Sequence, residues 1–328
     1  MRKNIPFLLC IIFVFLFLPM VCLFSGASQT VPPPTPDSPA PSDSSQETVS
    51  VLDPATGKVR VLSLIEYLTG VTAAQCLPDG EPEAIKALVI AARSRLEYRK
   101  ACSSHENGAV CTDGNHCDSF WTEEETKQNW GTYWFGQYYP VLQDAVAQVA
   151  GQVLTYEGKP VLALSHALSS GQTETAGEFG LDLPWIIGTD SPFDITANNY
   201  SVTVRFSAGE FKERMLSSFS DTDWSAPEEQ WVADIQTSSA GGVISLTAGG
   251  RNITGQEFAS ALGLPSNHFT TEYRDGKLIF TVTGMGNGFG ISRYGANELA
   301  KRGYDAEAIL RHYFSVCEIQ SFQRSAGS

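Results

Sequence analysis

The feature that most constrains the fold is a helical stretch beginning at Pro82, followed by a loop that holds two cysteines and two histidines. Pro82 suits the first position of a helix, because the N–H that proline lacks has no partner there. Apolar residues then recur at helical spacing and form one stripe: Ile85, Leu88, Val89, Ala92 and Leu96. We expect this helix to bury that one face and to leave its basic residues, such as Arg93 and Arg95, mostly off it.

The loop after the helix carries a candidate metal site with the pattern H-x5-C-x4-H-C: His105, Cys111, His116 and Cys117. Two thiolates and two imidazoles suit tetrahedral zinc, and four protein ligands leave no place for a reactive water, so we predict a structural Zn²⁺. The alternative is a disulfide, Cys102–Cys111 or Cys111–Cys117, beside two surface histidines. Zinc is favoured because that alternative leaves the paired histidines unexplained.

Composition excludes some classes of function. The chain has 328 residues and a net charge of -14, which argues against a nucleic-acid partner. Hydrophobic residues at 42% suffice for a sizeable core. Outside the leader and the proposed metal site, Cys76, Cys102 and Cys317 remain, and this odd number indicates no disulfide framework.

The N-terminal part predicts a membrane anchor. Residues 5–24 are nearly all apolar and follow Arg2 and Lys3, which favours a single-pass cell-membrane helix with a cytoplasmic tip. The alternative is a signal peptide cleaved near Ser25-Gly26-Ala27, and both place the rest of the chain outside the cytoplasm. We therefore divide the chain into residues 1–27 (tip and anchor), a Pro/Ser-rich linker at 28–48, and a folded domain at 49–328.

The rest of the chain predicts an α+β domain, with a mainly antiparallel sheet and packed amphipathic helices. A hairpin is expected from residues 49–52 and 58–62, and further strands at 153–156, 160–165, 202–206, 231–236, 242–248 and 277–283. Helices are expected at 63–74, 134–148, 207–219, 253–262, 292–302 and 305–314. Residues 121–130 are acidic and polar and are given no element.

Two further motifs give only weak evidence for a nucleotide-binding site or a hydrolase site. The glycines at 284, 286, 288 and 290 do not match G-x-G-x-x-G, so close backbone approach to a neighbour or a glycan is favoured over phosphate binding. Ser165 and His166 are adjacent on an expected strand and point to opposite faces, which argues against a nucleophile–base pair.

Several motifs together resemble the stage II sporulation protein D and LytB family. They are residues 67–78 and 83–93, the H-x5-C-x4-H-C loop, 145–158, 169–174, 284–296 and 309–313. They occur in the family's order and span nearly all of the chain after residue 50. The resemblance also implies zinc at this ligand spacing and an anchor before the domain.

The family resemblance implies a peptidoglycan lytic transglycosylase linked to forespore engulfment. Such an enzyme cleaves the bond between N-acetylmuramic acid and N-acetylglucosamine in glycan strands stripped of peptides. One carboxyl donates a proton to the glycosidic oxygen and then assists attack by the muramic 6-hydroxyl. Implied partners are glycan strands, the membrane, and other engulfment or cell-wall proteins.

The chain departs from the family at the catalytic position. The family's acid is a Glu eight residues before the Glu of the next helix, and here Gln75 stands eight residues before Glu83. An amide cannot give up and regain a proton at useful pH. Asn287 replaces the family's His, Arg293 its Gln, and Ser170 a Gly. Glu83 itself is expected to be a solvated partner of the helix dipole rather than a replacement acid.

Two functions follow. The first is a peptidoglycan lytic transglycosylase, whose activity Gln75 would impair unless another residue supplies the acid. The second is a catalytically inactive glycan-binding scaffold in a cell-wall remodelling complex. In both, Gln75 lies at the floor of a glycan site. Other side chains would hold the sugar by hydrogen bonds: Thr72, Ser169, Ser170, Thr173, Asn287, Ser292 and Arg293.

Overall fold

The computed structural model describes residues 47–102, 105, 110–114 and 116–322. These residues all lie in one of the two compact units into which the chain divides, Pro41–Ser328. The predicted anchor and nearly all of the linker lie outside the described residues. Within the described ranges, no helix is both long and apolar enough to cross a membrane.

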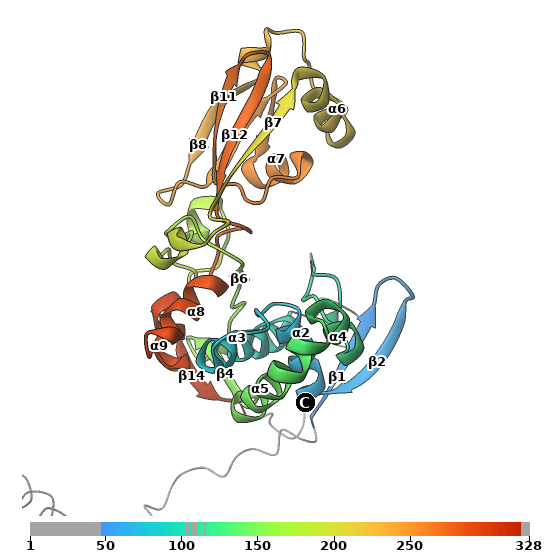
Figure 1. Cartoon of the computed structure of the whole chain (residues 1–328), viewed down its shortest axis with the longest axis vertical. Helices are drawn as coiled ribbons and strands as arrows, with labels where there is room; N and C mark the ends of the chain where they lie inside the picture. Colours follow the sequence, from blue (N-terminus) through green and yellow to red (C-terminus); the bar gives the residue numbers. More distant parts are fainter. Residues whose placement is uncertain (1–46, 103–104, 106–109, 115, 323–328) are drawn as a thin grey trace, which may run out of the picture. The chain divides into compact units, whose positions relative to one another are not determined.

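The predicted central helix is α3 (Pro82–Ala101), with Pro82 in its first turn. It packs against α2 (Leu64–Ala73), α5 (Thr132–Val149), α8 (Arg293–Lys301) and α9 (Ala306–Tyr313), which surround it in Figure 1. Every residue from 84 to 97 except Lys86 is buried. The expectation of a single buried face was therefore wrong.

Ion pairs explain how a helix with so many charges is buried. Arg93 is 1% exposed, and its Nη2 lies 2.7 Å from Glu47 Oε2 and 3.3 Å from Glu97 Oε1. A buried charge is tolerated where it is paired and hydrogen-bonded. Hydrophobic periodicity locates the apolar stripe but does not reveal carboxylates that arrive from elsewhere in the chain.

The predicted hairpin is confirmed as β1 (Thr48–Asp53) and β2 (Lys58–Ser63). The short β3 (Val110–Cys111) pairs with β1 in parallel, placing Cys111 beside Leu52. Ser63 caps α2, because its hydroxyl accepts a hydrogen bond from Glu66 N at 3.1 Å. The polar segment before α5 is helix α4 (Glu123–Trp130), which was missed although its N-cap Thr122 and Glu125 form a capping box.

A second hydrophobic core is formed between residues 201 and 283, drawn in yellow to orange in Figure 1. One antiparallel sheet holds β7 (Ser201–Ser207), β12 (Lys277–Thr283) and β11 (Phe269–Arg274), and another holds β8 (Val232–Thr237), β9 (Val243–Ala248) and β10 (Arg251–Thr254). Helices α6 (Ala208–Ser218) and α7 (Gly255–Leu262) complete this core. Strands β10 and β11 were not predicted.

The remaining strands bring distant segments together. β14 (Glu318–Ser321), β4 (Gln152–Tyr156) and β5 (Lys159–Pro160) form one sheet, and β6 (Ser165–His166) pairs in parallel with β13 (Ile291–Ser292). The strand expected at 160–165 is thus interrupted, since residues 161–164 are in no strand. The α+β class is confirmed, with mainly antiparallel pairing, but the described strands form five small sheets rather than one.

Candidate functional site

Gln75 follows the C-terminal end of α2. The backbone N–H groups of Gln75 and Cys76 both donate to Thr72 O, at 3.0 and 2.8 Å, and this turn fixes where the Gln75 side chain begins. That side chain is half-buried.

The Gln75 amide is part of a network from four segments of the chain. Its Nε2 donates to Asp118 Oδ1 at 3.1 Å, while its Oε1 accepts from Arg95 Nη2 at 3.1 Å and from Ser165 Oγ at 3.3 Å. Arg95, 2% exposed, also donates to Asp118 Oδ1 at 2.8 Å and to the Ala163 carbonyl at 2.7 Å. The amide is therefore oriented by two donors and one acceptor.

The carboxylate that contacts Gln75 already serves two guanidinium groups. Asp118 accepts from Arg95, and its Oδ2 accepts from Arg99 Nη1 at 3.1 Å. Both oxygens of this carboxylate therefore accept charge-assisted hydrogen bonds from arginine side chains.

Glu83 is also occupied by other groups. It accepts from Lys86 Nζ at 2.7 Å and from Ala306 N, at the start of α9, at 2.9 Å. The hydrogen bond from Lys86 lowers the pKa of Glu83, which favours the ionised form and makes it a poor general acid.

Arg293, the first residue of α8, lies next to this network. The β6–β13 pairing sets Ser165 beside Ile291 and His166 beside Ser292, so Arg293 directly follows the paired segment. Burial, and then the charge of Arg95, lowers the pKa of the Arg293 guanidinium. The approach of the two segments depends on Gly290, which has φ +68°, and a Cβ there would lie 2.1 Å from Leu164 O. The expectation of close backbone approach to a neighbour is met at this position.

Four of the predicted sugar contacts are buried: Thr72 (1% exposed), Ser169 (2%), Thr173 (1%) and Ser292 (0%). Ser169 N donates to Asp194 Oδ2 at 2.8 Å, while the hydroxyls of Ser169 and Ser292 accept from Gly171 N and Gly295 N, each at 3.1 Å. In this structure these side chains support the backbone near Arg293, and their contact with a sugar stays a prediction.

Two further predicted contacts are more exposed. Asn287 is half-buried, and its Oδ1 accepts from Phe289 N at 3.1 Å. Ser170 is also half-buried, and its Oγ has no partner among the described residues.

Sequence reasoning missed Asp194. It is fully buried, and burial raises the pKa of its carboxyl group. Pro192-Phe193-Asp194 gives no motif that could have drawn attention to it.

The four predicted metal ligands do converge, with one ligand atom from each lying within 4.8 Å of the others. His105 Nε2 lies 3.1 Å from His116 Nδ1, and Cys117 Sγ lies 3.6 and 3.5 Å from those two nitrogens. Zinc bonds of about 2.0 Å to nitrogen and about 2.3 Å to sulfur give tetrahedral edges of roughly 3.3 to 3.8 Å. The donor set and its spacing therefore fit zinc.

The alternative disulfide is absent from the described part of the chain, where Cys76, Cys102, Cys111, Cys117 and Cys317 are all free. Burial raises the pKa of the Cys117 thiol, so a cation is needed to favour its thiolate. Asp118, which contacts Gln75, is the residue after Cys117. The metal loop and the Gln75 network are therefore adjacent in the chain and in space.

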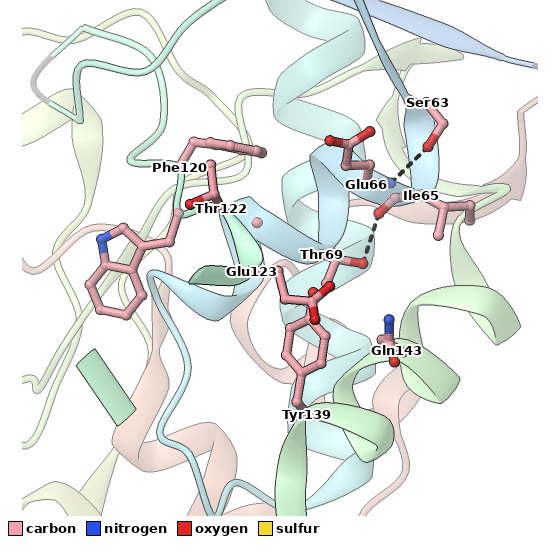
Figure 2. Close-up of a pocket in the computed structure, with 11 residues that line it drawn as sticks. Ser63, Ile65, Glu66, Thr69, Phe120, Thr122, Glu123, Tyr139 and Gln143 are labelled. Atoms are coloured by element: carbon pink, nitrogen blue, oxygen red, sulfur yellow. Dashed lines mark hydrogen bonds between the residues drawn. The ribbon is translucent and has the colours of Figure 1, made fainter. Parts of the chain in front are cut away.

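A separate pocket of about 310 Å³ lies along α2 and does not include Gln75. Figure 2 shows Glu66, Glu123, Tyr139 and Gln143 around it, with Phe120 at its side. Burial raises the pKa of Tyr139, and the carboxylates of Glu123 and Glu66 raise it further.

Comparison with known proteins agrees with the motifs. Residues 53–156 match the family model described as stage II sporulation protein. Stage II sporulation protein D of Bacillus amyloliquefaciens and that of Bacillus subtilis are each 29% identical over 276 residues, covering 83% of this chain and 78% of theirs. An uncharacterized protein of Brachyspira hyodysenteriae is 24% identical over 270 residues, covering 81% of this chain and 69% of its own.

Proposed function

Because this chain belongs to the stage II sporulation protein D family, we propose that it binds peptidoglycan glycan strands at the Gln75 site during sporulation and is an impaired lytic transglycosylase. Its substrate would be strands of N-acetylmuramic acid and N-acetylglucosamine that have lost their peptides. The observation that carries the proposal is the neutral amide of Gln75 at the family's acid position.

The reaction needs a group that donates a proton to the glycosidic oxygen and then takes one from the attacking hydroxyl. Gln75 offers only a neutral donor and acceptor, and both are engaged with Asp118, Arg95 and Ser165. It can position a sugar but cannot carry the proton. Loss of a positioned general acid costs about 10²–10⁴ in rate, so weak residual cleavage is compatible with this proposal.

Zinc, when bound by His105, Cys111, His116 and Cys117, would supply a structural cross-link of the loop. This cross-link would also fix the position of Asp118, because Asp118 directly follows Cys117. Asp118 in turn orients both Arg95 and Gln75. We therefore infer that the metal loop supports the geometry of the site without taking part in the reaction.

A second function rests on the same network. The hydrogen bonds around Gln75 hold it in place without any proton-transfer group, which suits an inactive glycan-binding scaffold for other engulfment or cell-wall proteins. In both functions residues 5–24 would remain as a membrane anchor, with the domain outside the cytoplasm. Mass spectrometry of the native protein tests the anchor, and a mature N-terminus near Ser28 would contradict it.

The deciding experiment is digestion of denuded glycan strands, with analysis for anhydro-muramic ends. We expect slow or absent cleavage by the wild type, and glycan binding that Gln75→Ala weakens. Gln75→Glu supplies the missing carboxyl and should cleave faster than the wild type. If the wild type already cleaves as fast as Gln75→Glu, another residue supplies the acid and the impaired-enzyme proposal is wrong.

A further inference from the structure

The charges around Gln75 do not balance. Among the described residues, Asp118 is the one carboxylate that bonds to Gln75, whereas Arg95 and Arg99 are both bonded to Asp118 and the Arg293 charge acts on Arg95 and Cys76. Asp118 pairs with Arg95 and Arg99. Among the described residues, the Arg293 guanidinium has no hydrogen-bond or ion-pair partner.

Helix geometry directs Arg293 toward the segment that follows Gln75. Residues four apart lie on one face of a helix, so Arg293 shares a face of α8 with Asn297. The Asn297 Oδ1 accepts from Glu81 N at 2.8 Å, which places that face against the segment after Gln75. The β6–β13 pairing, which sets Ser165 beside Ile291, brings the start of α8 to the same place.

The nearest thiol does not neutralise Arg293. Burial raises the pKa of Cys76 to about 12, so this thiol is uncharged at neutral pH. A partly buried guanidinium without a counter-ion is costly, and a carboxylate that accepts two parallel N–H bonds removes that cost. Arginine rather than lysine suits such a planar, bidentate partner.

We propose that Arg293, next to the Gln75 network, forms a binding site for the free lactyl carboxylate of a muramic acid residue. This inference rests on the proposed function, and it names the group on the strand that the site recognises. A muramic acid that still bears a peptide has an amide in place of this carboxylate. The positive charge of this site would therefore attract denuded strands more strongly than strands that bear peptides. Elsewhere the net charge of -14 of the protein repels these anionic strands.

The test is calorimetric binding of denuded oligosaccharides to the purified full-length protein, compared with the same oligosaccharides after reduction of their carboxylates to alcohols. Because the reduced sugar loses a hydrogen bond to a charged group, we expect it to bind the wild type roughly 10-fold or more weakly. Arg293→Gln should lose the same factor toward the natural sugar and should no longer distinguish the two. Arg293→Lys should recover part of the preference.

The matched control is Arg311→Gln, which removes an exposed guanidinium that pairs with Glu307 on α9 and should leave binding unchanged. Equal binding of both sugars by the wild type would overturn the carboxylate site and leave the proposed function intact. Unchanged discrimination in Arg293→Gln would also overturn the site. Binding of neither sugar by the wild type would overturn the proposed function together with this inference.

Discussion

The metal loop and the Gln75 network lie side by side but differ in the groups that they bring together. The loop holds four side chains that could bind a metal ion, and their donor atoms lie within 4.8 Å of one another. The Gln75 network centres on a neutral amide that is bonded to Asp118, Arg95 and Ser165. The difference teaches that the groups which shape a site and a group which could transfer a proton there need not occur together.

Arg95 and Asp118 physically join the two regions. Asp118 follows Cys117 in the loop, and Arg95 contacts both Asp118 and Gln75. Perturbing either region should therefore show whether the loop serves only as support, and the following predictions run from the largest expected effect to the smallest.

The largest effect should come from loss of a metal ligand. Cys111→Ser removes a thiolate from the zinc site, and metal loss is among the few single changes that cost about 5 kcal/mol. We expect less than about half an equivalent of zinc by elemental analysis and a melting temperature lowered by roughly 10 °C. Cys102→Ser is the control, because Cys102 is exposed and outside the ligand set. A wild type that folds fully without zinc would contradict the structural role.

Arg95→Met should be the next most damaging change. It leaves Arg99 as the remaining ion-pair partner of the buried Asp118 and removes the donor to Ala163 O. Removing one partner of a buried ion pair costs about 3–5 kcal/mol, to be measured by urea unfolding. Arg311→Met, at an exposed pair, should cost less than about 1 kcal/mol. Similar losses in both variants would show that the Arg95 network has no special role in stability.

His166, beside Ser165, should make stability depend on pH. Burial lowers the pKa of His166 from 6.5 to about 4. The charges of Arg293 and His268 lower this pKa further, whereas the hydrogen bond to the Phe289 carbonyl raises it. As the pH falls, the unfolded chain therefore takes up the His166 proton before the folded chain does. The contribution of neutral His166 to the free energy of unfolding is fully present above pH 6.5 and is lost as the pH falls toward 4. The loss should approach about 3 kcal/mol, and His166→Gln should remove this part of the slope. An unchanged slope in that variant would contradict the assignment.

The smallest effect should be a partial gain of activity. In Gln75→Glu the new carboxyl would accept hydrogen bonds from Arg95 and Ser165, which lower its pKa, and would also face the Asp118 carboxylate, which raises it. Because these effects oppose each other, we expect a gain of about 10-fold or less over the wild type. Release of anhydro ends measures it, with Gln75→Ala as the control that supplies no acid. A Gln75→Ala variant as fast as Gln75→Glu would show that the new carboxyl is not the source of the gain.

Much of the local structure could be predicted, because its causes lie within a few residues. Pro82, the apolar stripe of α3 and the Ser63 cap each act over one or two turns. The metal ligands also lie within one loop, so their spacing alone indicated the site. Helix α4 was missed because its capping box precedes a segment with little apolar periodicity.

The parts that could not be predicted depend on distant partners. Nothing near Arg93 or Arg95 in the sequence announces that Glu47 and Asp118 will pair with them. The orientation of the Gln75 side chain depends on Ser165 and Arg95, which are 90 and 20 residues away in the sequence. Likewise, the position of Ser169 depends on Asp194, which no motif marks.

The burial of α3 by elements from both ends of the chain has a consequence for the order of folding. Helices α8 and α9 cover α3, and β14, which ends at Ser321, pairs with β4. Contacts between segments so far apart in sequence form late, because the intervening chain must first be ordered. During synthesis the Gln75 site therefore cannot be completed until almost the entire chain has emerged. A product truncated before α8 should expose the apolar side of α3 and be a target for proteolysis.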